Sequence, residues 1–120
     1  MNRKRINFLV LARAAAKIAD DKKGEEIYIL NVKKYSSLAD YFLLITANSY
    51  PQIRAISEHI KKSIKEDFDL LPIHKEGKYS DSWAVLDYGG LLIHVMSLKA
   101  RKFYRLDKLW ENARHISFEK

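Results

Sequence analysis

The chain has 120 residues, the length of a single domain, and we treat residues 1–120 as one unit. Hydrophobic residues make up 48% and charged residues 31%, close to the averages of globular proteins, which excludes a largely disordered chain. The absence of cysteine excludes disulfide scaffolds, thiolate metal sites and cysteine catalysis. No apolar run approaches the roughly 20 residues of a membrane-spanning helix.

The formal net charge is +7, and the positive charge is concentrated at the two ends of the chain. Residues 1–23 hold seven basic and two acidic residues, and residues 99–120 hold seven and three. The middle, residues 24–98, is slightly acidic, with eight basic and ten acidic residues. Basic ends favour proximity to RNA or to an acidic partner, although they also serve solubility alone. The acidic middle argues against a nucleic-acid groove there.

The first predicted element is a helix over residues 6–23, which is rich in alanine, has apolar residues at helical spacing and ends at Gly24. Its basic start followed by the apolar residues 8–12 is also similar to a signal or transit peptide. Arg13 interrupts the apolar stretch, and the helical pattern continues into the domain. We therefore assign this segment to the fold.

Two strands and a second helix follow in the pattern. Residues 27–32 and 41–46 are apolar on both faces, which predicts strands covered on both sides of a sheet. Ser49 and Gln52 fit a capping box that begins a helix ending near Asp67. One stripe of this helix is made of four isoleucines at helical spacing: Ile53, Ile56, Ile60 and Ile64.

The second half of the chain predicts three more strands and a last helix. Residues 70–74 are a short strand candidate, which Pro72 confines to a sheet edge or a strand start. Residues 82–88 and 91–96 are apolar runs joined by Gly89-Gly90, a strong hairpin signal. Residues 98–113 carry a helical apolar face. The order α-β-β-α-β-β-β-α predicts a single α/β domain with a mixed five-stranded sheet covered by helices.

Catalytic and ligand-binding patterns are not apparent in the sequence. There is no glycine-rich phosphate loop, no paired acids on one strand and no serine on a nucleophile elbow. No two histidines have metal-ligand spacing; they are His59, His74, His94 and His115. We therefore predict no metal site, and the residues give an enzymatic activity no support without excluding it. The apolar flanks of His94 favour a buried, hydrogen-bonded core histidine, with a functional surface contact as the alternative.

An aromatic and polar cluster lies on the predicted hairpin. Strand alternation places Trp83 and Asp87 on one face and Tyr88 on the other, with His94 on the second strand. Tryptophan and tyrosine are frequent in protein interfaces and in ordinary cores, and composition alone favours the core. Asp87 has two interpretations, because it either contacts a partner or accepts hydrogen bonds from its own hairpin backbone.

Several segments carry a resemblance that extends from about Leu9 to Trp110. They are Asp21-Lys22-Lys23, residues 36–42, residues 49–56, residues 83–89, His94-Val95, residues 101–106 and Leu109-Trp110. In this order and at these intervals, they resemble the ribosomal silencing factor family (RsfS, Iojap-like). The departures are Ala47 in place of a glycine, Gly90 in place of an acidic residue and Met96 in place of a phenylalanine.

The resemblance implies a nucleotidyltransferase-like α/β fold without catalytic acids, and therefore a protein that is not an enzyme. It implies binding to the large ribosomal subunit through a ribosomal protein at the intersubunit face, with ribosomal RNA nearby. The bound factor would block association with the small subunit and repress translation under nutrient limitation. No cofactor and no membrane are implied, and the free protein is expected as a homodimer. The expected location is the bacterial cytoplasm, with an organelle as the alternative.

The same resemblance directs the expected contact surface to the hairpin and its flanks. The expected partner-binding residues are Trp83, Asp87, Tyr88, His94, Arg101 and Tyr104. We hypothesise that Asp87 pairs with a basic group of the ribosomal partner. Two rivals remain: a nucleotide-binding or nucleotidyltransferase enzyme of the same fold, and a direct RNA-binding module. The missing acid pair counts against the first, and the acidic middle of the chain counts against the second.

Overall fold

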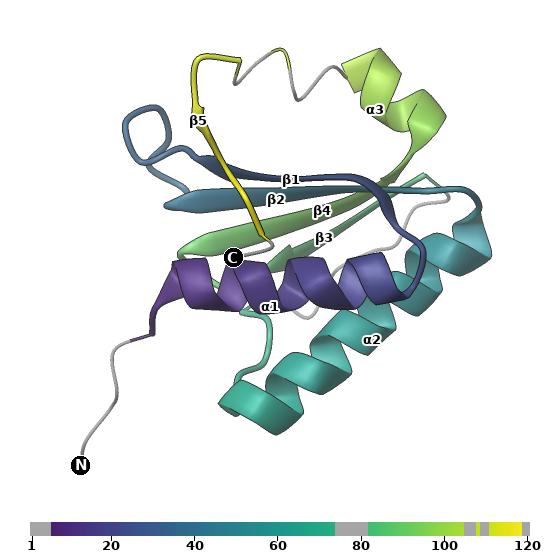
Figure 1. The fold of residues 1–120 in the computed structure, drawn as a ribbon, viewed down its shortest axis with the longest axis horizontal. Helices are drawn as coiled ribbons and strands as arrows, with labels where there is room; N and C mark the ends of the chain where they lie inside the picture. The colour runs from purple at the N-terminus through teal and green to yellow at the C-terminus, as the bar shows by residue number, and fades with distance from the viewer. Residues whose placement is uncertain (1–5, 74–81, 105–107, 109–110, 119–120) are drawn as a thin grey trace.

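The computed structural model describes residues 6–73, 82–104, 108 and 111–118. Its elements in chain order are α1 (Phe8–Asp21), β1 (Glu25–Asn31), β2 (Tyr41–Ala47), α2 (Tyr50–Phe68), β3 (Trp83–Asp87), β4 (Leu91–Ser97), α3 (Leu98–Tyr104) and β5 (Arg114–Ile116). The strands form one sheet in the order β3-β4-β2-β1-β5. α1 and α2 cover one face and α3 lies on the other (Figure 1). The predicted α/β domain with a five-stranded sheet is confirmed.

The sheet is mixed because β2 and β4 run parallel while the other neighbouring strands are antiparallel. All of β2 is buried, as its doubly apolar sequence predicts. The same prediction is only half right for β1, where Tyr28 is 38% exposed and only Ile29 and Leu30 are buried. The reason is that the core layer beside α3 reaches Leu30 but not the start of this strand.

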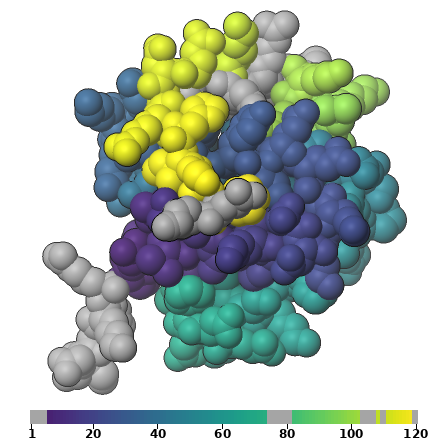
Figure 2. Space-filling model, in the orientation of Figure 1, coloured from purple at the N-terminus to yellow at the C-terminus, as the bar shows by residue number. Residues whose placement is uncertain are grey.

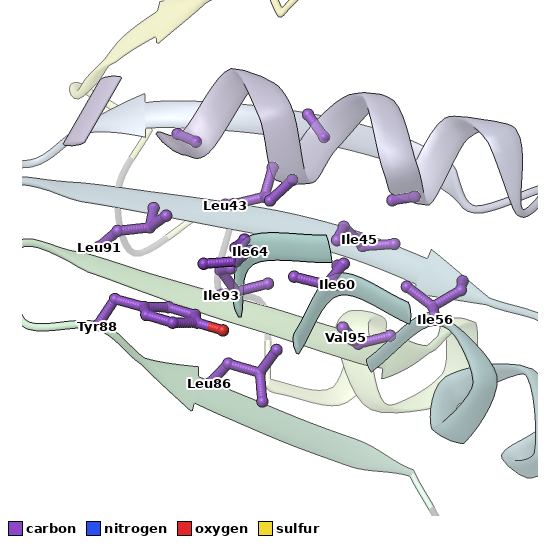
Figure 3. Close-up of a cluster of buried hydrophobic side chains, with 14 of the residues drawn as sticks. Leu43, Ile45, Ile56, Ile60, Ile64, Leu86, Tyr88, Leu91, Ile93 and Val95 are labelled. Atoms are coloured by element: carbon purple, nitrogen blue, oxygen red, sulfur yellow. The ribbon is translucent and has the colours of Figure 1, made fainter. Parts of the chain in front are cut away.

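The larger core layer lies between the sheet and the pair α1 and α2 (Figure 3). The four isoleucines of the predicted α2 stripe are all fully buried in it. α1 contributes Leu11 and four buried alanines, whose small side chains let this helix pack closely. The smaller layer, on the α3 side, is made of eight buried residues: Leu30, Val32, Ala39, Phe42, Leu44, Met96, Ala100 and Ala113.

Polar side chains begin both long helices. Asn7 caps α1, since its Oδ1 accepts from the amides of Leu9 and Val10 at 3.1 and 3.2 Å. Ser49 caps α2 by accepting from the Gln52 amide at 3.2 Å, as the capping box predicts. The Gln52 side chain accepts from the Asn48 amide instead of the Ser49 amide, and it donates to the carbonyl of Lys22 at 3.2 Å. Gln52 thus links the start of α2 to the end of α1.

In the second half of the chain one predicted strand is wrong and the end of one predicted helix differs from the structure. Residues 70–73 form no strand, and position 74 lies outside the described residues. The fifth strand is instead β5, which pairs with β1 from Ile29 to Asn31. The last predicted helix is confirmed over α3 and at Lys108, residues 105–107 and 109–110 lie outside the described residues, and residues 111–113 are irregular, so only its predicted end is wrong. The apolar residue at position 113 is buried as predicted, but an irregular segment places it there.

Candidate functional site

The β3–β4 hairpin gives the candidate site its framework. In β3, Ala84 and Leu86 are buried against the helices, while Trp83, Val85 and Asp87 are half-buried on the opposite face. Gly89 takes a φ of 91°, in the left-handed region that favours glycine. Gly90 packs against Phe8, whose ring a Cβ at this position would overlap. The turn therefore depends on both glycines, for different reasons.

The Asp87 carboxylate stabilises its own turn. Its Oδ1 accepts from the Gly89 amide at 2.8 Å, which is the structural alternative considered for this residue. Its backbone carbonyl accepts from the Ile73 amide at 2.6 Å, so the chain after α2 is attached to the outer edge of β3. The half-buried side chain still presents surface to a partner. Both roles of Asp87 are therefore compatible with its geometry.

Trp83 and His94 form a hydrogen-bonded aromatic pair between β3 and β4. The Trp83 Nε1–H donates to His94 Nδ1 at 3.1 Å, and the Phe42 ring lies 5.1 Å from the imidazole. His94 is 8% exposed, as expected for a core histidine. Burial lowers the pKa of His94 to about 4, and the nearby positive charge of Arg101 acts in the same direction. The imidazole is therefore neutral at neutral pH.

Arg101 lies inside the molecule, at the other end of the sheet from the hairpin turn. Its Nη1 donates to the Glu26 carbonyl at 2.6 Å and to Thr46 Oγ1 at 2.8 Å. Its guanidinium carbon lies 4.9 Å from the centre of the Tyr28 ring. Only 4% of the residue is exposed. Arg101 thus joins α3 to β1 and β2 and offers little surface to a partner in this conformation.

The six expected partner-binding residues therefore do not form one continuous surface. Tyr88 is 5% exposed and packs in the core beside Leu86 and Ile93 (Figure 3). Tyr104 ends α3, and its side chain lies outside the described residues. Trp83 and Asp87 retain surface, whereas Tyr88, His94 and Arg101 are internal. A contact role for these residues stays a prediction.

Two neighbours of Trp83 and Asp87 were missing from the expected set. Val85 lies between them on β3, and Leu92 pairs with Asp87 from β4; both are half-buried on the same sheet face. We call Trp83, Val85, Asp87 and Leu92 the open strip. Strand alternation places Val85 on the same face as Trp83 and Asp87. Leu92 lies directly opposite Asp87 in the hairpin, and opposed residues of two antiparallel strands share a face, so the sequence also contains the signal for Leu92.

Two kinds of feature are absent from the described part of the chain. Within residues 6–73 and 82–118, as far as they are described, no three histidine, aspartate or glutamate side chains come together as a metal site. In the same part of the chain, no helix is both long and apolar enough to cross a bilayer.

Comparisons with known proteins give a consistent result. The family model described as "Ribosomal silencing factor during starvation" matches residues 6–120. The ribosomal silencing factor RsfS of Halalkalibacterium halodurans is 36% identical over 109 residues, covering 91% of this chain and 92% of that protein. The chloroplastic protein Iojap of Arabidopsis thaliana is 32% identical over 108 residues, which are 90% of this chain but 44% of that longer protein.

Solved structures agree with the sequence matches. A crystal structure of a Chromobacterium violaceum protein superposes with a TM-score of 0.81 at 26% identity, covering 96% of this chain and 94% of that one. A crystal structure of a Bacillus halodurans protein superposes with a TM-score of 0.71 at 32% identity, covering 92% of this chain and 96% of that one. With a family model that spans nearly the whole chain and relatives above 30% identity, the chain belongs to the ribosomal silencing factor (RsfS, Iojap) family.

Proposed function

We propose that this protein binds the large ribosomal subunit through a ribosomal protein at the intersubunit face. The bound domain sterically blocks association with the small subunit and represses translation under nutrient limitation, in the cytoplasm. The observation that carries this proposal is the family match over residues 6–120, whose description names ribosomal silencing during starvation. The curated names of the relatives are those of a regulatory factor, which supports a role without catalysis.

The physical properties of the domain suit a steric block. Such a block needs a rigid body that occupies space, and the described residues extend over 45 × 31 × 28 Å around two filled core layers. Close-packed interiors resist deformation, so a bound domain would not yield to an approaching subunit. The affinity has to come from a modest interface with aromatic and apolar anchors.

We propose the open strip as part of that interface. Trp83 and Val85 supply apolar contact area, and Asp87 supplies a negative charge for a basic group of the ribosomal protein. His94 holds the Trp83 indole by a hydrogen bond and thereby fixes this anchor. Tyr88 and Arg101 act from inside by fixing the hairpin and α3. Tyr104 is proposed as a flanking contact from the end of α3.

Sedimentation of purified subunits through a sucrose gradient, with and without the protein, tests the function. We expect the protein to migrate with the large subunit and whole ribosomes to disappear as its concentration rises. A variant with Trp83→Ala should migrate near the top, since a central aromatic anchor contributes about 2 kcal/mol or more. Protein that stays at the top while the subunits join normally would overturn the proposal.

Two substitutions separate the two roles of Asp87. Asp87→Asn keeps an oxygen that can accept from the Gly89 amide but removes the charge, so stability should hold while affinity for the large subunit falls about tenfold. Asp87→Ala removes both and should also lower the free energy of unfolding by about 1 kcal/mol. Urea unfolding and subunit binding are measured on the same samples. Unchanged affinity of a stable Asp87→Asn variant would show that Asp87 serves the turn alone.

A further inference from the structure

A basic pocket lies where the loop after β1 meets the segment that leads into β5. It encloses about 280 Å³ and is lined by six residues: Asn31, Lys33, Lys34, Tyr35, Asn112 and Arg114. Figure 2 shows the loop, in blue at the upper left, beside the yellow C-terminal segment. The two segments are about 80 residues apart in the sequence, so the fold alone creates this pocket.

The described residues of the pocket lining carry three positive charges and no negative one. Lys33, Lys34 and Arg114 are all exposed, and none of the three pairs with an acidic side chain among the residues that the structure describes. Two acids near in the chain lie outside the lining: Glu111 pairs with Lys108 at 3.6 Å, and Asp40 lines an adjacent hollow that Lys33 also lines. Three unneutralised cations around one concavity favour an anionic ligand.

Local contacts join the two segments that carry these cations. The Lys33 amide donates to Asn31 Oδ1 at 3.1 Å, and Lys33 Nζ lies 5.1 Å from the centre of the Tyr41 ring. Tyr35 Oη donates to the Asn112 carbonyl at 3.4 Å, which ties the loop to the C-terminal segment. Arg114 is paired with Asn31 in the β1–β5 ladder. The basic side chains therefore come from two segments that backbone and side-chain contacts join, and lysine and arginine side chains can donate charge-assisted hydrogen bonds to a phosphate group.

The pocket lies at the same end of the sheet as the tip of the β3–β4 hairpin. The amides of Asp40 and Tyr41, which close the loop after β1, both donate to the Gly90 carbonyl at 3.0 Å. Asn31, Tyr41 and Leu91 are successive partners across this end of the sheet. A large body that meets the hairpin tip can therefore also reach the pocket.

We infer that this basic pocket binds the phosphodiester backbone of ribosomal RNA when the protein sits on the large subunit. The inference rests on the proposed function, because it takes the RNA to belong to the subunit that the open strip contacts. The pocket supplies charge and position without base readout, since lysine and arginine contacts to phosphates carry no sequence information. The inference also assigns a binding partner to Lys33 and Lys34, which belong to the middle of the chain, where acidic residues outnumber basic ones.

The first test compares binding to purified large subunits over a series of KCl concentrations. The pocket variant combines Lys33→Gln, Lys34→Gln and Arg114→Gln. The matched control combines Lys17→Gln, Lys62→Gln and Arg54→Gln, which removes the same charge from exposed positions on α1 and α2. Losing three phosphate contacts should lower the slope of log affinity against log salt by about 2 to 3 and weaken binding at least about tenfold at low salt.

The second test uses bare ligands and does not depend on the ribosome. Amide resonances of residues 31–35 and 112–114 are followed by NMR while a short RNA hairpin or inorganic phosphate is added. We expect RNA to shift these amides in the wild-type protein and the control but not in the pocket variant. Inorganic phosphate at an equal phosphate concentration should shift them far less, because a polyanion releases counterions and a single phosphate does not.

The outcomes separate this inference from the proposed function. If the pocket variant binds large subunits with unchanged affinity and salt slope, the inference is overturned while the proposed function stands. If the wild-type protein does not bind large subunits, the proposed function falls, and the NMR shifts alone decide whether the pocket takes RNA. If affinity falls without a change in slope, the three side chains do not contact phosphates. If inorganic phosphate shifts the amides as strongly as RNA, the pocket takes a small anion. Either result overturns the inference.

Discussion

At the scale of single residues, the hydrogen bond from Trp83 to His94 fixes both side chains. Because Nδ1 accepts from the indole, the neutral imidazole carries its proton on Nε2. That nitrogen is buried and has no hydrogen-bond partner among the described residues. Protonation of Nδ1 would remove the acceptor for Trp83 and place a charge in an apolar layer. The pair is therefore stable only while His94 is neutral.

This pair makes stability depend on pH. The pKa of His94 is about 4 when folded, against about 6.5 for an exposed histidine, so between these values the unfolded chain binds a proton that the folded protein does not. Stability is then complete above about pH 6.5 and falls as the pH drops. From pH 7 to pH 5 we expect the wild-type protein to lose about 2 kcal/mol more than His94→Gln, which keeps an acceptor for Trp83. Urea unfolding at both pH values measures the difference, and equal losses would contradict it.

The behaviour of individual residues was only partly predictable from sequence. The apolar neighbours of His94 identify a buried histidine because they belong to the same strand. Arg101 offers no such signal, since its partners are the carbonyl of Glu26 and the hydroxyl of Thr46, far away in the chain. Glu26 adopts a φ of 47° at a register shift in β1, a local conformation that no pattern of residue types announces. The sequence therefore predicts an exposed Arg101, whereas the structure buries it.

At the scale of elements, the start of α1 and the tip of the hairpin are packed together through Phe8 and Gly90. A Cβ at position 90 would overlap the Phe8 ring, so this chain has room for a side chain there only if α1 or the ring moves. We expect Gly90→Ala to lower the free energy of unfolding by about 1 to 2 kcal/mol. In a Phe8→Ala background the same substitution should cost less than about 0.5 kcal/mol, because the ring is gone. Additive effects in this double-mutant cycle, followed by urea unfolding, would refute the contact.

The elements that sequence predicts well are those with strong internal patterns. α2 has four isoleucines on one stripe and a capping serine, and β2 is apolar throughout, so both agree closely with the structure. β5 has only three residues, Arg114–Ile116, and two of them are exposed. Its existence depends on pairing with β1, and a three-residue strand has no periodicity to detect. The apolar run from Leu70 has the residue pattern of a strand, but its described residues, 70–73, make one backbone hydrogen bond to β3, at Ile73.

At the scale of the whole molecule, the fold rearranges the charges that the sequence separates. Arg114 comes from the basic C-terminal part, whereas Lys33 and Lys34 come from the acidic middle, and the β1–β5 pairing brings the three together. Net charge over a stretch of sequence therefore underestimated this surface. The net charge of residues 24–98 is an average over 75 residues, and it does not describe the single loop that carries Lys33 and Lys34.

A steric block by the whole domain predicts a particular form of inhibition. If the protein and the small subunit exclude each other from one face, the amount of protein that halves association must rise in proportion to the small-subunit concentration. Saturating protein should abolish association completely, and excess small subunits should restore it. Light scattering of mixed subunits measures both, with the Trp83→Ala variant as the control that has lost an anchor. Two results would contradict a steric block: inhibition that levels off at partial association, and inhibition that does not depend on the small-subunit concentration. Either would mean that the protein acts by altering the large subunit and not by occupying its face.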